Sequence, residues 1–312
     1  MKRRDLPMRR PLDLLGLALV SCAAGVLASG GCSVVESVGD TLADATQGTV
    51  VSDAFRGTAR LAESFRDYSP AEEHYIGRAV GAEILARYRV HPDRKLQEYV
   101  NLVGLAVLAA PEAKRTFSGY HFVVVEGPEV QAVSVPGGFV FVTEGTVRRA
   151  KDEDELAAVL AHEVAHVSLK HGVGSIRAAT RKRSLALLAK SAGEIGGTAG
   201  GGDLAALAAN LGDVAREIAS EALVKGYSRG SELDADREAI GYLKASGYSP
   251  AALASYLETL AREGTGGEGG WRATHPAPAD RIAALRQVEG SGRIAPGREV
   301  RKVRFEASVG KS

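Results

Sequence analysis

The sequence predicts an α+β fold that is mostly helical, with a small antiparallel sheet of about three strands. Two observations lead to this prediction. Apolar residues recur at helical spacing over several long stretches that begin at capping residues. Three short β-branched and aromatic runs lie between residues 120 and 143, separated by Gly and Pro. With 312 residues, 45% of them hydrophobic, the chain is long enough to bury a sizeable core.

The charge and the cysteine content exclude two classes of function. Lys and Arg number 39 against 38 Asp and Glu, so the basic surplus of a nucleic-acid binder is missing, and we expect no nucleic-acid partner. The two cysteines, Cys22 and Cys32, both lie near the N-terminus. The rest of the chain therefore offers no thiol for a disulfide framework or a thiolate metal site.

The first residues have the pattern of an export signal. Five basic side chains lie within residues 1–13, and an uncharged stretch rich in Leu, Val, Ala and Gly follows. A membrane-spanning anchor is the less favoured alternative, because Gly and Ser interrupt the stretch and it only just reaches spanning length.

The uncharged stretch ends in small residues before Cys32, which resembles the lipobox of bacterial lipoproteins. We therefore expect residues 1–31 to be a lipoprotein signal peptide and Cys32 to carry the lipid, with Cys22 as the alternative. Ser33 is typical of sorting to the outer rather than the inner membrane. The lipid would hold a periplasmic domain at the membrane surface.

A folded domain is expected from residue 70 onward. Residues 32–69 mix small and polar residues and are predicted to form a tether and a leading helix. Ser69 is a suitable N-cap and Pro70 a suitable first helical residue, which predicts a helix with inward-facing apolar residues as far as Leu85. A second helix is predicted over Asp93 to Ala109.

Strands are predicted at His121–Val125, Ala132–Val135 and Phe139–Thr143, with a turn at Pro136-Gly137-Gly138 between the last two. These three strands form the expected antiparallel sheet.

The next helix is the most clearly marked. It is predicted to begin at Asp152, which has capping-box spacing to Glu155, and to end at Gly172 in the left-handed conformation. The domain is expected to span residues 70–290, and residues 291–312 to form a polar, extended C-terminal tail. Further helices are predicted at about 204–224, 232–246, 250–262 and 278–288.

Inside this helix lies the pattern His162-Glu163-Val164-Ala165-His166. Histidines at i and i+4 project from one helix face, within reach of one metal ion. Zinc lowers the pKa of a bound water from about 15.7 to roughly 7. Glu163 can accept the proton from this zinc-activated water and deliver it to a leaving amine. The pattern predicts a zinc metallopeptidase, although so short a pattern also arises by chance on a packed helix.

A third ligand must come from elsewhere in the chain. His171 follows His166 by five residues and would point away from the metal on a continuous helix. Glu232 and Asp236 lie at i and i+4 of a later helix, so Glu232 could bind zinc while Asp236 fixes the tautomer of a ligand histidine. From these residues alone, an acidic first turn of a helix without a metal fits equally well.

Three segments together resemble the HtpX-like and BepA-like zinc metallopeptidases, relatives of the CAAX prenyl protease with an HExxH gluzincin site. These are the Pro-Gly-Gly strand pair over residues 135–143, HExxH with a further His over 162–171, and the Ser-Arg-x-x-Glu-x-x-Ala-Asp-Arg run over 228–237. Thr274-His275-Pro276 with a later Arg281 also fits. The resemblance implies a zincin-like metalloprotease domain.

The resemblance also implies roles for single residues. One zinc ion per chain would be held by His162, His166 and Glu232, with Glu163 as the general base. Asp236 and Arg281 would support the site from outside, and His275 would lie near the metal as a catalytic group or a reversible plug. An edge strand would bind substrate as an added strand, through Gly138, Phe139, Val140 and Phe141.

The sequence therefore predicts a lipid-anchored zinc endopeptidase of the periplasm that cleaves unfolded or misassembled cell-envelope proteins. One alternative is a non-enzymatic, zinc-containing envelope chaperone or assembly factor. The other is a structural lipoprotein in which the HExxH pattern is accidental.

Overall fold

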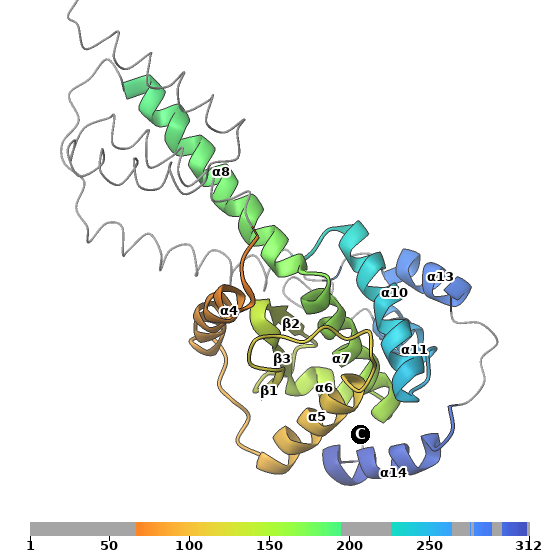
Figure 1. Ribbon diagram of the computed structural model, residues 1–312. Helices are drawn as coiled ribbons and strands as arrows, with labels where there is room; N and C mark the ends of the chain where they lie inside the picture. Colours follow the sequence, from red (N-terminus) through yellow and green to blue (C-terminus); the bar gives the residue numbers. More distant parts are fainter. Residues whose placement is uncertain (1–66, 195–225, 264–274, 276–277, 289–294, 311–312) are drawn as a thin grey trace, which may run out of the picture. The chain divides into compact units, whose positions relative to one another are not determined.

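The computed structural model describes residues 67–194, 226–263, 275, 278–288 and 295–310 (Figure 1). The chain divides into two compact units, Tyr68–Ser175 with Asn210–Ser312, and Met1–Asp67 with Ile176–Ala209. The predicted signal peptide, Cys32 with its predicted lipid, nearly all of the predicted tether and the predicted helix at 204–224 lie outside the described residues. Within the described residues, no helix combines the length and the apolar character that crossing a bilayer requires.

The described part of the smaller unit consists of Asp67 and most of α8 (His171–Glu194). The Asp67 carboxylate pairs with Arg177 of α8 at 2.7 Å. The remaining elements belong to the larger unit, which contains every described residue of the predicted site.

The sheet of the larger unit has strands at the predicted positions, but its pairing differs from the prediction. β1 (His121–Val125), β2 (Ala132–Val135) and β3 (Phe139–Thr143) lie in the order β1-β3-β2. β3 runs antiparallel to β2 but parallel to β1, so the sheet is mixed. The chain reverses after β1 and again after β2, which makes β1 and β3 run the same way. Because β3 inserts between the other two, it is the central strand.

The tight turn between β2 and β3 brings α4 (Pro70–Leu85) onto the sheet. Gly137 and Gly138 of this turn have φ values of 80° and 96°, a region that side chains with a Cβ rarely adopt. A Cβ on Gly137 would also lie 2.6 Å from the Cα of His74 in α4. The two glycines therefore permit both the turn and the close approach of the helix.

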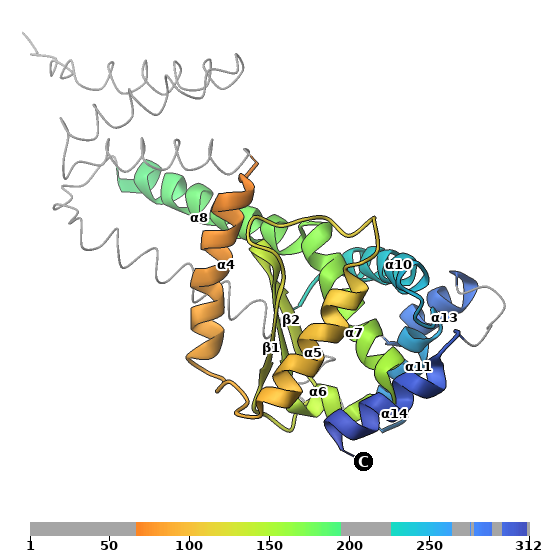
Figure 2. The same cartoon turned by 60° about the horizontal axis from the view of Figure 1, so that its bottom comes forward.

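The sheet lies between α4 on one face and α5 (Arg94–Val107) with α7 (Glu153–Ser168) on the other (Figure 2). Side chains of β3 alternate between the two faces. Val140 and Val142 join the core together with α5 and α7. Phe139 lies on the α4 side, where its ring centroid is 5.3 Å from that of His74.

Helix α7 lies at the centre of the larger unit (Figure 1). Every residue from Glu153 to His166 is buried, because α7 packs against β2 and α5 and against three later helices. The Ala-rich sequence lets these neighbours approach from several sides. The later helices are α10 (Arg229–Ser246), α11 (Ala252–Glu263) and α14 (Arg298–Val309). Two shorter helices complete the unit, α6 (Glu144–Arg149) before α7 and α13 (Pro278–Val288) against α10 and α11.

The expected end of α7 at Gly172 is wrong. The helix begins as predicted, with Asp152 accepting a hydrogen bond from the Glu155 backbone N–H. It ends at Ser168, and Lys170 takes the left-handed conformation with φ 58°. α8 then begins at His171, so the chain changes direction between the two helices.

The expected extended tail is also wrong, because residues 298–309 form α14 and pack against α7 and α5. Phe305 and Val309 of α14 are buried. Three arginines on α14 pair with carboxylates at the start of α7: Arg298 with Asp152, Arg301 with Asp154 and Arg304 with Glu153. The polar composition of residues 291–312 did not predict a packed helix, because its arginines pair with buried carboxylates and not with apolar side chains.

Candidate active site

Helix α7 presents its two predicted ligand histidines toward Glu232 in the first turn of α10. The Nε2 atoms of His162 and His166 are 3.0 Å apart. Glu232 lies against both rings, with Oε2 at 3.5 Å from His162 Nε2 and Oε1 at 3.3 Å from His166 Nε2. All three side chains are at most 1% exposed, so one carboxylate and two imidazoles share a dry interior site.

His275 provides a fourth donor atom, from the segment before α13. Its Nδ1 lies 3.3 Å from His162 Nε2 and 2.9 Å from Glu232 Oε2. All four donor atoms lie within 4.8 Å of one another. A tetrahedral zinc site with bonds of about 2.0–2.1 Å has ligand atoms roughly 3.3 Å apart. The five separations given above, 2.9 to 3.5 Å, are close to this spacing, and nitrogen and carboxylate oxygen are donors that zinc accepts.

His162 is oriented by a carboxylate on its other side. Its Nδ1 lies 2.9 Å from Oδ1 of Asp236, one turn after Glu232 on the same face of α10. Burial would raise the pKa of Asp236, but the Arg281 guanidinium outweighs burial and holds this pKa at about 2. The charged carboxylate therefore accepts a hydrogen bond from Nδ1–H of His162, and Nε2 faces the cluster.

Arg281 of α13 connects the two α10 carboxylates. It donates to both oxygens of Asp236, at 2.8 and 2.6 Å, and its Nη1 lies 2.9 Å from Glu232 Oε2. Its side chain is 1% exposed. Burial opposes the ionised form of Glu232, but the surrounding histidines hold the pKa of this carboxyl well below its ordinary value.

His171 contacts His166, contrary to the expectation that it would point away. The two Nδ1 atoms are 2.8 Å apart. The expectation assumed a continuous helix, whereas the left-handed turn at Lys170 carries His171 back toward the site. No role for this histidine was predicted from the sequence. The further His after HExxH was the only signal for it.

Glu163 is fully buried beside the cluster. Neither of its carboxylate oxygens accepts a hydrogen bond from the residues that the structure describes. Its Oε1 lies 3.4 Å from His275 Nε2. A buried carboxylate without hydrogen bonds is costly, so its retention suits a group that serves a reacting molecule.

The expectation that β3 binds substrate at a free edge is wrong. Gly138 belongs to the turn, while Phe139, Val140 and Phe141 belong to the central strand, which pairs with a neighbour on each side. The order of the strands, which local sequence signals do not specify, decides this. Among the described strands, β2 is an edge strand of the sheet that lies next to the cluster, because Ala132 O lies 3.4 Å from His275 Nε2.

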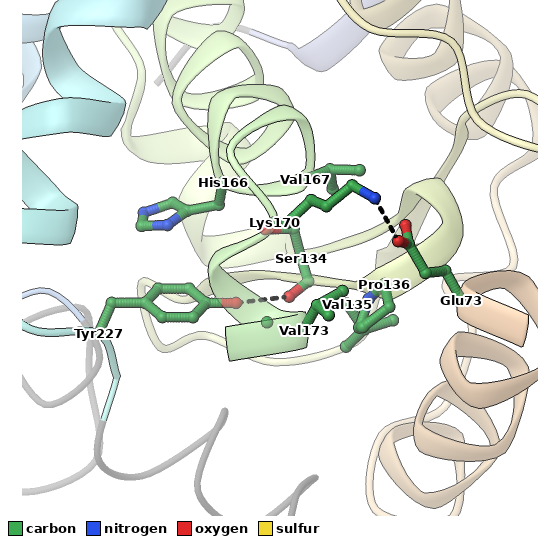
Figure 3. A pocket seen from close by; sticks show the side chains of 10 residues that line it. Glu73, Ser134, Val135, Pro136, His166, Val167, Lys170, Val173 and Tyr227 are labelled. Atoms are coloured by element: carbon green, nitrogen blue, oxygen red, sulfur yellow. Dashed lines mark hydrogen bonds and ion pairs between the residues drawn. The ribbon is translucent and has the colours of Figure 1, made fainter. Parts of the chain in front are cut away.

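Tyr227 lies beside this edge, just before α10 (Figure 3). Its hydroxyl donates to Ser134 O at 3.2 Å, and its ring stacks on His166 with centroids 4.2 Å apart. Tyr227, Ser134 and His166 line one pocket, and its opposite wall carries the Lys170–Glu73 ion pair. Tyr227 was not predicted as a site residue, because no local sequence pattern marks a tyrosine whose contacts are to residues distant in sequence.

The HExxH helix beside a small sheet, with a carboxylate from a second helix, defines a metallopeptidase site of the zincin type. The chain belongs to peptidase family M48, whose sequence pattern matches residues 94–289. The predicted relation to zinc metallopeptidases is thereby confirmed.

Several characterised proteins are similar to this chain. The beta-barrel assembly-enhancing protease of Yersinia pestis is 30% identical over 203 residues, which cover 62% of this chain and 39% of that protein. Metalloprotease LoiP of Escherichia coli is 30% identical over 167 residues, which cover 53% of this chain and 61% of LoiP. The mitochondrial metalloendopeptidase OMA1 of Schizosaccharomyces pombe is 30% identical over 166 residues, covering 53% and 45%. The matched region thus spans about two fifths of the first of these relatives.

Proposed function

We propose that this protein is a zinc-dependent endopeptidase that cleaves unfolded or misassembled proteins of the cell envelope. The observation that carries the proposal is the cluster of four buried donor atoms beside Glu163, a buried carboxylate that accepts no hydrogen bond from the described residues, in an M48 chain. The export signal predicted at the N-terminus and a relative named for β-barrel assembly support the envelope as the place of action.

His162, His166 and Glu232 would hold one zinc ion. When bound, the ion would supply a Lewis acid that polarises the scissile carbonyl and acidifies a water molecule. Asp236 fixes the Nδ1 proton of His162, which directs Nε2 toward the ion. Arg281 keeps the Asp236 carboxylate ionised and in place.

Glu163 would act as the general base. It would take a proton from the attacking water and pass it to the amine of the leaving peptide. Its position on the helix, one residue after His162, puts it beside the ligands without making it one of them. The absence of hydrogen bonds from described residues suits both transfers, because no standing partner has to be displaced.

His275 would act as a reversible plug. Its Nδ1 lies among the donor atoms of the three proposed ligands, where it would take the position that a catalytic zinc site keeps open for water. The protein with His275 inserted would be latent, and departure of this ring would open the site. A residue that stabilises the transition state must lie outside the set of ligands. The position of His275 Nδ1 among the donor atoms therefore favours a plug.

The substrate would bind as an extended strand along the edge of β2 that pairs with no described strand, in place of the predicted edge on β3. Strand addition uses main-chain hydrogen bonds and so tolerates many sequences, which suits unfolded proteins as substrates.

We further propose that the protein is periplasmic and is held by a lipid on Cys32 at the membrane, more specifically the outer membrane. Radiolabelled lipid incorporated by the Cys22→Ala variant but not by the Cys32→Ala variant would support this assignment. The reverse pattern would place the lipid on Cys22.

Cleavage of casein by the purified protein tests the function. We expect about one zinc per chain, loss of cleavage on chelation and recovery when zinc is returned. Zinc binding without any cleavage, even in the His275→Ala variant, would favour the alternative of a non-enzymatic chaperone or assembly factor. Family membership does not favour that alternative.

A further inference from the structure

We propose that Tyr227 is an edge cap, a side chain that occupies the place of an incoming polypeptide on β2 and must move away before an extended substrate can bind. This inference rests on the proposed function and deepens it, because it names the residue that controls access of substrate. It concerns a residue outside the set of proposed ligands and the proposed base.

The backbone of β2 directs alternate carbonyl groups toward the edge that pairs with no described strand. Thr143 N–H of β3 donates to Gln131 O, so carbonyl groups at odd positions face β3. Those at even positions, Ala132 and Ser134, therefore face outward. An added strand would use both outward carbonyls through N–H groups two residues apart.

Side chains of this chain contact both outward carbonyls. His275 Nε2 lies 3.4 Å from Ala132 O, and the Tyr227 hydroxyl donates to Ser134 O at 3.2 Å. The two side chains thus stand where successive N–H groups of a substrate strand would donate. His275 also belongs to the metal cluster, whereas Tyr227 meets the edge independently of any ligand atom.

The Tyr227 ring also covers part of the metal site. It stacks on His166 with an interplanar angle of 19°, so movement of the ring would uncover that face of the imidazole. Burial raises the pKa of the Tyr227 phenol well above its ordinary value, so the hydroxyl remains a donor at physiological pH. Competition from a substrate N–H group for Ser134 O would release the cap.

A second observation at this edge indicates a polar occupant. The Ser134 hydroxyl is buried, at 2% residue exposure, and it has no hydrogen-bond partner among the residues that the structure describes. Ser134 and Tyr227 both line the same pocket (Figure 3). A main-chain group of an extended peptide could supply the missing bond.

The backbone on either side of Tyr227 allows the side chain to move without displacing α10. Gly226 has a φ of 61°, a conformation open to glycine without strain. Ser228 is fixed as the N-cap of α10, where its side chain accepts a hydrogen bond from the Ser231 backbone N–H. The residue between them can therefore turn while the helix that carries Glu232 stays in place.

The Tyr227→Phe variant tests the cap, because it removes the hydroxyl and keeps the stacked ring. Binding of a fluorescein-labelled unstructured casein peptide is measured by fluorescence anisotropy, using the full chain with Glu163→Gln to prevent cleavage. We expect about three- to tenfold tighter binding, the range for losing one competing hydrogen bond. Tyr75→Phe is the matched control, since Tyr75 is 61% exposed on α4, and it should bind as the parent does.

The same substitution in the protein with Glu163 intact separates the cap from a chemical role. We expect KM for casein to fall three- to tenfold while kcat and zinc content stay unchanged. Unchanged peptide binding and KM, or a fall in kcat at constant KM, would overturn the proposal. Tighter binding without cleavage by any variant would refute the proposed function and leave the cap standing. Cleavage by the parent, with no change in KM or binding on Tyr227→Phe, would refute the cap alone.

Discussion

The Nδ1 atoms of His166 and His171 face each other at 2.8 Å, across the turn between α7 and α8. If His166 binds zinc through Nε2, its Nδ1 carries the proton and donates to Nδ1 of His171. Burial lowers the pKa of His171, which keeps it neutral and able to accept. His171 would then fix the tautomer of His166, as Asp236 fixes the tautomer of His162.

Removal of this partner should weaken zinc binding. We expect the His171→Ala variant to bind zinc about 10- to 100-fold more weakly, because the ligand ring loses the acceptor that fixes its tautomer. His171→Gln should recover part of the affinity, since its amide oxygen can accept the same hydrogen bond. Competition with a chromophoric chelator measures the affinity, and His121→Ala, at an exposed position on β1, is the control. Equal affinity in His171→Ala and the parent would exclude the role.

Arg281 should stabilise the metal-free protein more than the zinc-loaded protein. Without zinc, its guanidinium is the main permanent positive charge beside the buried Glu232 and Asp236. We expect Arg281→Met to lower the free energy of unfolding by about 3–5 kcal/mol without zinc. The loss should be smaller with zinc, which neutralises Glu232. Urea unfolding with and without zinc measures the two unfolding free energies. Arg237 is an exposed arginine on α10, and Arg237→Met should change neither free energy.

The C-terminal helix should contribute strongly to stability through Arg301. The Arg301 guanidinium lies 2.6 Å from Asp154, whose side chain is fully buried at the start of α7. We expect Arg301→Met to cost about 3–5 kcal/mol of unfolding free energy, because it leaves that carboxylate buried and unpaired. Arg286→Met breaks the exposed pair with Glu258 and should cost less than about 1 kcal/mol. Similar losses in the two variants would contradict the structural role of α14.

His275 should limit the rate of cleavage. If its ring plugs the fourth position of the cluster, the His275→Ala variant should cleave casein faster than the parent at equal zinc content. Initial rates at saturating zinc measure the effect. A fall in kcat of about 100-fold or more, the size expected for loss of an acid–base group, would instead identify His275 as catalytic.

Local patterns in the sequence predict the elements that carry the chemistry. The strands occupy the predicted ranges because Gly and Pro bound each one. The cap at Asp152 sets the start of α7, and helical periodicity then puts His162 and His166 on one face. The same periodicity puts Glu232 and Asp236 together on α10, where the structure brings both to His162.

The remaining features depend on contacts between residues distant in sequence. The strand order β1-β3-β2 arises because β3 pairs with both β1 and β2. The sequence of a single strand does not specify which strands it pairs with. The turn at Lys170 uses a left-handed residue that is not glycine, so the sequence does not mark the end of α7. The contact of Tyr227 with Ser134 joins residues 93 positions apart. Such relations require the tertiary structure.

The most direct test of the central claim is a paired measurement on the Glu163→Gln variant. We expect zinc content to remain near one per chain and casein cleavage to fall by about 10²- to 10⁴-fold, because the ligands are intact while the general base is lost. Glu98→Gln, an exposed glutamate on α5, is the control and should cleave as the parent does. Undiminished cleavage by Glu163→Gln, or a parent protein that cleaves casein without bound zinc, would contradict the account.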